Sequence, residues 1–226
     1  MPDHACERAP VTGTIHLVRH AETLFNVAGQ LQGWCDSPLT ERGERQAAAL
    51  GERMREVPLV AAFTSDLTRT RTTAAAALAG HPSLEAEPMV ELREWHFGAF
   101  EGQPNASLWE PVFADHGYSY VPSSADWPRM TDAGLDSVLD AIHRHDPSGR
   151  ADSGATVQAR VEAAIARFVP AAEHGDVLVV THGAVLGSIL RALDPAHRPQ
   201  RGYPNCAVVS VTDGVIGEVD GSCATA

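Results

Sequence analysis

Short apolar runs alternate with longer amphipathic segments along most of the 226-residue chain. Runs that are rich in β-branched residues and bounded by glycine or polar residues are typical of buried strands. Such runs cover residues 14–18, 59–64 and 177–180, and a further pair at 207–212 and 215–219 flanks Asp213-Gly214, which is a hairpin turn sequence. Apolar residues at helical spacing predict helices at 40–57, 67–78, 135–145, 156–169 and 184–193.

The order of these elements indicates the fold class. Strands that are separated by helices form largely parallel sheets, and helices cover such sheets on both faces. We therefore expect an α/β fold around a mostly parallel central sheet. The chain length and the 44% of hydrophobic residues suit a single domain over residues 1–226.

The pattern breaks down between Gly102 and Leu135. This stretch holds four prolines, shows no clear period and contains five of the thirteen aromatic residues. The five are Trp109, Phe113, Tyr118, Tyr120 and Trp127. Two interpretations stay open for this irregular or helical insertion at about residues 103–134: it forms a small apolar cluster of its own, or it is a lid over a substrate site, since long irregular segments are often binding loops.

The charged residues exclude several functions. All 17 Lys+Arg positions are arginine, so the chain has no amine side chain for Schiff-base catalysis or for the lysine of a P-loop. The formal net charge of −12, without a run of basic residues, argues against nucleic acid as a partner, because nucleic-acid binding needs several basic side chains on phosphates.

The cysteines and the apolar runs bear on the cellular compartment. Cys6, Cys35, Cys206 and Cys223 form no CxxC pair and no His/Cys group with zinc-ligand spacing, so we expect free thiols and no metal. The first ten residues lack the apolar stretch of a secretory signal, and no run approaches the roughly 20 apolar residues of a membrane span. These observations favour a cytoplasmic protein without a membrane partner.

Four polar motifs lie at or near the ends of the predicted strands. They are LVRHAETLFN at 17–26, SDLTRTRTTA at 65–74, LREWHFGAFEG at 92–102 and VLVVTHGAVL at 177–186. Because the carboxyl ends of parallel strands face the ligand crevice, we expect the motifs to meet at one site.

Together the motifs hold the groups that phosphoryl transfer through a covalent intermediate requires. An imidazole such as that of His20 can attack phosphorus, cations can stabilise charge on the equatorial oxygens, and an acid can protonate the leaving oxygen. Arginine suits this task because its planar fork matches phosphate oxygens. Gly183 follows His182 at a predicted helix start, where backbone N–H groups bind anions, and we include it in the phosphate site.

The acid candidate is Glu94. It stands among Trp95, Phe97 and Phe100, a setting that can raise the pKa of a carboxyl group by desolvation.

In type, order and separation, these motifs resemble those of the histidine phosphatase superfamily, also called phosphoglycerate-mutase-like, over about residues 14–211. The resemblance implies a three-layer α/β/α sandwich, a phosphohistidine intermediate on His20, and Glu94 as proton donor and then base. It also implies which side chains surround the phosphate. Arg19, Arg69 and His182 would hold the phosphoryl group, with Thr23, Asn26, Gln32 and Gly33 around the pocket.

Two departures from the family pattern are informative. Gly183 follows His182 where the acid-phosphatase and phytase branch has an aspartate donor, so the resemblance favours the branch whose donor is a glutamate like Glu94. Ala21 stands where the first motif has a glycine in most of the family.

Three functions stay open for such a protein: a phosphatase, a cofactor-dependent phosphoglycerate mutase, and a catalytically silent phosphate-binding module. The mutases carry a tyrosine and an asparagine where this chain has Phe97 and Ala184, and a basic cluster in the insertion, where this chain has Arg129 alone. Retention of His20 and Glu94 disfavours the silent module. We therefore expect the protein to hydrolyse a small phosphorylated metabolite without a cofactor. The aromatic insertion suggests that the leaving group of the substrate has an apolar or stacking portion. The sequence leaves open whether the protein forms a homodimer.

Other polar residues have structural interpretations. The segment His143–Asp146 lies at a predicted helix end, where cations interact favourably with the helix dipole, rather than at a metal site. We expect Glu22 and Asp66 to pair with arginines, and the resemblance places Asn205 near the pocket.

Overall fold

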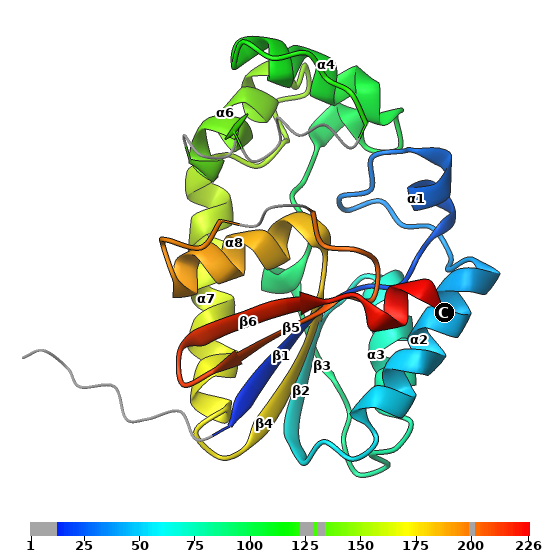
Figure 1. The fold of residues 1–226 in the computed structure, drawn as a ribbon. Helices are drawn as coiled ribbons and strands as arrows, with labels where there is room; N and C mark the ends of the chain where they lie inside the picture. Colours follow the sequence, from blue (N-terminus) through cyan, green and yellow to red (C-terminus); the bar gives the residue numbers. More distant parts are fainter. Residues whose placement is uncertain (1–12, 123–128, 131–133, 199–201) are drawn as a thin grey trace, which may run out of the picture.

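The protein is an α/β sandwich built around one six-stranded sheet (Figure 1). The computed structural model describes residues 13–122, 129–130, 134–198 and 202–226. The strands are β1 Thr14–Arg19, β2 Leu59–Ser65, β3 Glu87–Met89, β4 Asp176–Thr181, β5 Val208–Thr212 and β6 Val215–Asp220. They are ordered β3-β2-β4-β1-β5-β6. β1, β2 and β3 are each joined to the sheet by parallel pairing, and β5 is antiparallel to both β1 and β6, as the predicted hairpin requires.

Helices cover both faces of the sheet, which confirms the predicted fold class. The α-helices are α1 Leu24–Ala28, α2 Glu41–Met54, α3 Thr68–Ala77, α4 Asn105–Asp115, α6 Leu135–His145, α7 Gly154–Ala171 and α8 Gly183–Leu193. In Figure 1, α2 and α3 lie on one side of the sheet, α7 and α8 on the other, and α4 and α6 beyond its end. No helix of the described residues has the length and apolarity needed to cross a membrane.

The alternation of side chains in the central strands produces two apolar cores. Leu17 of β1 and Val179 of β4 pack into the cluster formed with α7 and α8. Val18 and Val180, one residue further along, pack into the cluster formed with α2 and α3. β4 is buried from Val177 to Thr181, as its continuous apolar sequence predicts, and β1 is buried at Ile15, Leu17 and Val18.

The insertion, expected to be irregular or helical, contains the regular helix α4. Leu108, Trp109, Val112 and Phe113 are buried on α4 with the i, i+4 spacing of one helix face, and they belong to the same apolar cluster as Leu17. Pro111 lies inside this helix. Proline removes one backbone hydrogen bond and is rare at such positions, so it concealed the helical pattern. Trp127 lies outside the described residues.

Short elements were also missed by the sequence patterns. α1 has five residues, with Thr23 as N-cap and Gly29 in the left-handed conformation at its end, and β3 has three. Neither is long enough to show a period. Cys35, Cys206 and Cys223 are free thiols, and Cys6 lies outside the described residues.

Candidate active site

The carboxyl ends of β1 and β4 bring two histidines together. His20 follows β1, and its backbone N–H donates to the Thr181 carbonyl at the end of β4 (2.9 Å). His182 comes next along the chain and is the N-cap of α8. The two rings are 5.3 Å apart between centroids and inclined by 63°, and their residues are only 3% and 0% exposed.

The surroundings of His20 leave one ring nitrogen available as a nucleophile. Nδ1 lies 2.8 Å from the carbonyl oxygen of Ala21, an acceptor only, so Nδ1 carries the proton. Burial, followed by the positive charges of Arg69 and Arg19, lowers the pKa of His20 well below 6.5. The ring is therefore neutral near pH 7, with a lone pair on Nε2.

Two arginines lie beside the histidines, in different hydrogen-bonding states. Arg69 of α3 donates from both Nη atoms to the carbonyls of residues 32, 33 and 35 and to Asp36 at 2.7–3.2 Å. Its remaining N–H, on Nε, is buried and has no partner among the described residues. Arg19 donates from Nη1 to the Tyr203 carbonyl at 2.6 Å, and its Nε likewise has no described partner. Both arginines thus keep an N–H group for an anion.

His182 and Gly183 lie next to these arginines. Both ring nitrogens of His182 are buried without a described hydrogen-bond partner. Gly183 begins α8 directly after this ring. A Cβ at Gly183 would lie 3.3 Å from Nε of Arg19, so glycine allows the guanidinium to approach the helix start closely.

Glu94 is anchored at the first turn of α8. Its carboxylate accepts N–H groups from Ala184 and Val185 at 3.1 Å and from Trp95 at 3.0 Å. Burial raises the pKa of Glu94 and outweighs these hydrogen bonds, which act in the opposite direction. The expected desolvated setting is therefore present, and the group can carry a proton at a higher pH than an exposed glutamate.

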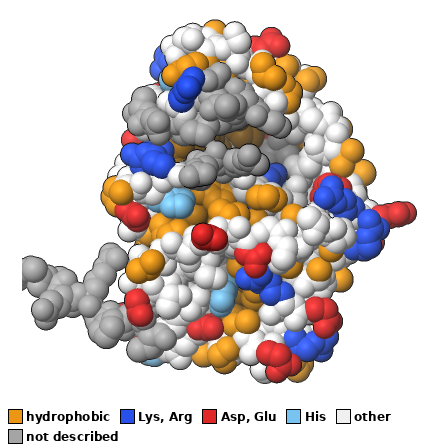
Figure 2. All heavy atoms as spheres, viewed as in Figure 1, with side chains coloured by type: hydrophobic (Ala, Val, Ile, Leu, Met, Phe, Trp, Pro, Cys, Tyr) orange, Lys and Arg blue, Asp and Glu red, His pale blue; other side chains and the backbone are white. Residues whose placement is uncertain are grey.

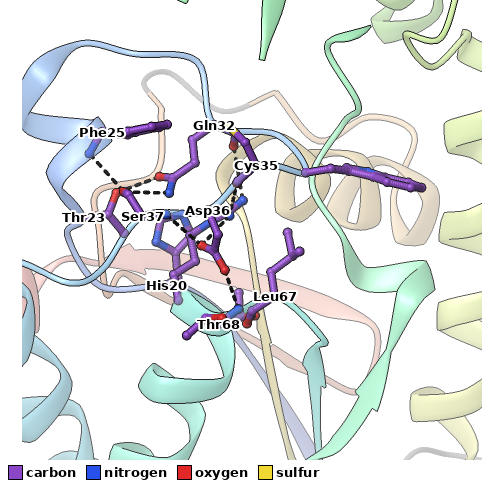
Figure 3. A network of polar contacts seen from close by, with 12 residues as sticks. His20, Thr23, Phe25, Gln32, Cys35, Asp36, Ser37, Leu67 and Thr68 are labelled. Carbon is purple, nitrogen blue, oxygen red and sulfur yellow. Dashed lines mark hydrogen bonds and ion pairs between the residues drawn. The ribbon is translucent and has the colours of Figure 1, made fainter. Parts of the chain in front are cut away.

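Thr23 and Gln32, two of the residues expected around the pocket, belong to a polar network with Ser37 in the loop that follows α1 (Figure 3). Thr23 Oγ1 donates to Gln32 Oε1 at 2.7 Å, and Gln32 Nε2 donates to Ser37 Oγ at 2.9 Å. Asn26 Oδ1 accepts the Thr23 N–H at 3.2 Å. Asn205, which the resemblance had placed nearby, donates to Asn26 Oδ1 and to the His20 carbonyl at 3.0 and 3.1 Å.

Glu101 organises the loop around Gly33 and was not singled out by the sequence. Its carboxylate accepts N–H groups from Gly33, Trp34, Cys35 and Phe97 at 2.9–3.1 Å. These donors hold the pKa of Glu101 below its ordinary value, although burial acts to raise it. Nothing in the spacing distinguishes Glu101 from an ordinary loop acid, because its partners are backbone groups.

The other polar residues have structural partners, as expected. Glu22 pairs with Arg42 at 3.1 Å and Asp66 with Arg93 at 2.6 Å. Asp146 caps α6 and accepts backbone N–H groups from residues 99, 148, 150 and 151. Among the described residues, no three His, Cys, Asp or Glu side chains are grouped so that they could hold a metal ion.

Comparisons with known proteins show which family and fold this chain resembles. Residues 15–214 match the model of the histidine phosphatase superfamily, branch 1. The probable phosphoglycerate mutase GpmB of Yersinia pestis (strain Pestoides F) is 32% identical over 200 residues, which make up 87% of this chain and 83% of that protein. The crystal structure of phosphoglycerate mutase from Bacillus anthracis superposes with a TM-score of 0.80 at 29% identity, covering 94% of this chain and 95% of that one. The α-ribazole phosphatase of Shigella flexneri shares the fold, with a TM-score of 0.67 at 24% identity over 93% of this chain and 97% of that one.

Proposed function

We propose that this chain, which belongs to branch 1 of the histidine phosphatase superfamily, hydrolyses small phosphate monoesters through a phosphohistidine on His20. The observation that carries the proposal is the state of the His20 ring. Its Nδ1 proton is committed to the Ala21 carbonyl, so Nε2 presents a lone pair beside N–H groups of Arg19 and Arg69 that have no described partner.

In the first step, Nε2 of His20 attacks the phosphorus atom and a P–N bond forms while the P–O bond to the leaving group breaks. Protonated Glu94 gives its proton to the leaving oxygen. The free Nε–H groups of Arg19 and Arg69 and the ring of His182 receive the negative charge of the equatorial oxygens.

In the second step, Glu94, now ionised, takes a proton from a water molecule that attacks the phosphorus. The P–N bond breaks, inorganic phosphate leaves, and His20 and Glu94 return to their starting states. The N–H groups of α8 stabilise the ionised form of Glu94 between the two steps.

Phosphoglycerate mutase activity is the second candidate, favoured by the names of two of the similar proteins. A mutase must hold a second phosphate and a carboxylate, which needs additional cations. Arg129 is the only arginine or lysine between residues 103 and 134, and it is exposed. Phe97 is buried in the apolar cluster and Ala184 offers only its backbone N–H to Glu94, so neither side chain adds a polar contact.

The test is hydrolysis of p-nitrophenyl phosphate by the wild type and by His20→Ala. The proposal predicts phosphate release by the wild type that the variant reduces to the background rate. Conversion of 3-phosphoglycerate to 2-phosphoglycerate that depends on added 2,3-bisphosphoglycerate, and exceeds hydrolysis, would instead establish the mutase. Turnover that survives His20→Ala unchanged would exclude His20 as the nucleophile.

A further inference from the structure

Glu94 lies in a segment without regular backbone pairing, so its position depends on other contacts. The segment follows the short 3-10 helix η1, Val90–Leu92, and continues to His96. Thr181 Oγ1 donates to the Leu92 carbonyl at 2.8 Å, and Trp34 Nε1 donates to the Glu94 carbonyl at 3.0 Å. The most extensive contacts come from α7.

Arg160 of α7 donates hydrogen bonds to three main-chain carbonyls of this segment. Nη1 donates to the carbonyls of Arg93 and Glu91 at 2.7 and 3.3 Å, and Nη2 donates to the Glu94 carbonyl at 3.2 Å. The guanidinium group is therefore bound by the main chain just before the proposed proton donor and at the donor residue itself. A planar fork with fixed N–H directions can make such a set of bonds, whereas the single ammonium group of a lysine cannot.

Asp152 binds both Arg160 and the C-terminal end of the segment at His96. Its Oδ2 accepts from Arg160 Nη2 at 2.7 Å and from the His96 N–H at 3.0 Å, and its own N–H donates to the His96 carbonyl at 2.9 Å. The side chains of Asp152 and Arg160 are 8% and 15% exposed. The ion pair neutralises a nearly buried cation and holds the segment at both ends, from residue 91 to residue 96.

The contacts of Arg160 and Asp152 with this segment matter most when Glu94 is protonated. The N–H groups of α8 bind the carboxylate form, and these bonds weaken when the carboxyl takes up the proton that it must deliver. The bonds from Arg160 go to backbone carbonyls, which do not titrate. They therefore hold the donor in place in both protonation states.

We propose that Arg160, fixed by Asp152, is a positioning residue that holds Glu94 at the leaving-group oxygen. The proposal rests on the proposed function, since it assigns a support to the donor of that reaction. It predicts that loss of the Arg160–Asp152 pair lowers kcat/KM more for substrates whose leaving oxygen needs a proton than for those whose leaving oxygen does not.

The experiment compares phenyl phosphate with p-nitrophenyl phosphate, two esters of similar shape whose leaving groups differ in basicity. The variants are Arg160→Gln, Glu94→Gln and the double variant, with Arg167→Gln as the control. Arg167 lies on the same helix and pairs with Glu87 at the surface, away from Glu94. The ratio of the two kcat/KM values is measured on one sample, so a partly unfolded preparation does not change it.

Arg160→Gln should lower kcat/KM for phenyl phosphate by about 10- to 100-fold and for p-nitrophenyl phosphate by about threefold or less. The double variant should be no worse than Glu94→Gln alone, and Arg167→Gln should match the wild type. Asp152→Asn, which keeps the guanidinium group in the chain, should shift the ratio in the same direction.

Equal losses with both esters in Arg160→Gln, while Glu94→Gln shifts the ratio, would overturn the positioning role and leave the proposed function intact. A double variant whose defect is the product of the two single defects would also overturn it, because Arg160 would then act independently of Glu94. A wild type that hydrolyses neither ester would overturn the proposed function, and the positioning role with it.

Discussion

Acid should destabilise the folded protein through His182, because this ring is completely buried. Burial, followed by the positive charge of Arg69 and smaller contributions that include Arg19, lowers the pKa of His182 well below its ordinary value of 6.5. The ring therefore stays neutral in the folded protein at pH values where it is protonated in the unfolded chain.

A histidine whose pKa falls on folding makes the protein less stable as the pH decreases, since the unfolded state binds the proton first. Between pH 7.5 and 5.5, a histidine with a pKa of about 6.5 takes up most of a proton, which favours unfolding by about 1.4 kcal/mol. His20 is buried in the same way and should add a similar amount. Glu94 acts in the opposite direction, because a carboxyl whose pKa is raised on folding is protonated first in the folded state.

The measurement is the free energy of unfolding in urea at pH 7.5 and 5.5, in a buffer without phosphate, for the wild type and for His182→Asn. The difference between the two proteins isolates His182 from Glu94 and His20. The wild type should lose about 1.4 kcal/mol more than the variant over this range. His174→Asn, which removes an exposed histidine, controls for the loss of an imidazole. Equal losses in the wild type and in His182→Asn would refute a neutral, buried His182.

Two further substitutions test how the loops are held. Gly33→Ala would place a Cβ 2.3 Å from the Trp95 carbonyl oxygen, so the loop around the pocket must shift. We expect kcat/KM to fall by about 100-fold. Gly187→Ala is the control, because a Cβ there would lie 3.4 Å from its nearest neighbour, in Tyr203. In the wild type, both carboxylate oxygens of Asp146 accept hydrogen bonds from backbone N–H groups. Asp146→Asn replaces one of these oxygens with an NH₂ group, which cannot accept them, so it should lower the free energy of unfolding in urea by about 2–4 kcal/mol. An active Gly33→Ala, or an unchanged unfolding midpoint for Asp146→Asn, would show that these loops adapt.

The strands of the sheet and the polar residues at its carboxyl edge could be predicted, because both follow from the pattern of side-chain types along the chain. The β-branched runs of β1 and β4 produce two largely buried neighbouring strands, and the residues that follow them, His20 and His182, meet because the strands are parallel and in register. The raised pKa of Glu94 followed from its aromatic neighbours for a similar reason, since Trp95 and Phe97 are buried beside it.

The groups that hold the candidate catalytic residues in place could not be predicted in this way. Glu101, Arg160 and Asp152 act largely on backbone N–H and carbonyl groups, which every residue offers alike, so no pairing of side-chain types marks their partners in the sequence. Arg160 is 66 residues from Glu94 along the chain, and the sequence pattern distinguishes it in no way from the other polar residues of an amphipathic helix. Its role appears only when the fold brings α7 against the segment that carries Glu94. Rate defects that depend on the leaving group, rather than sequence patterns, are therefore the means of identifying such residues.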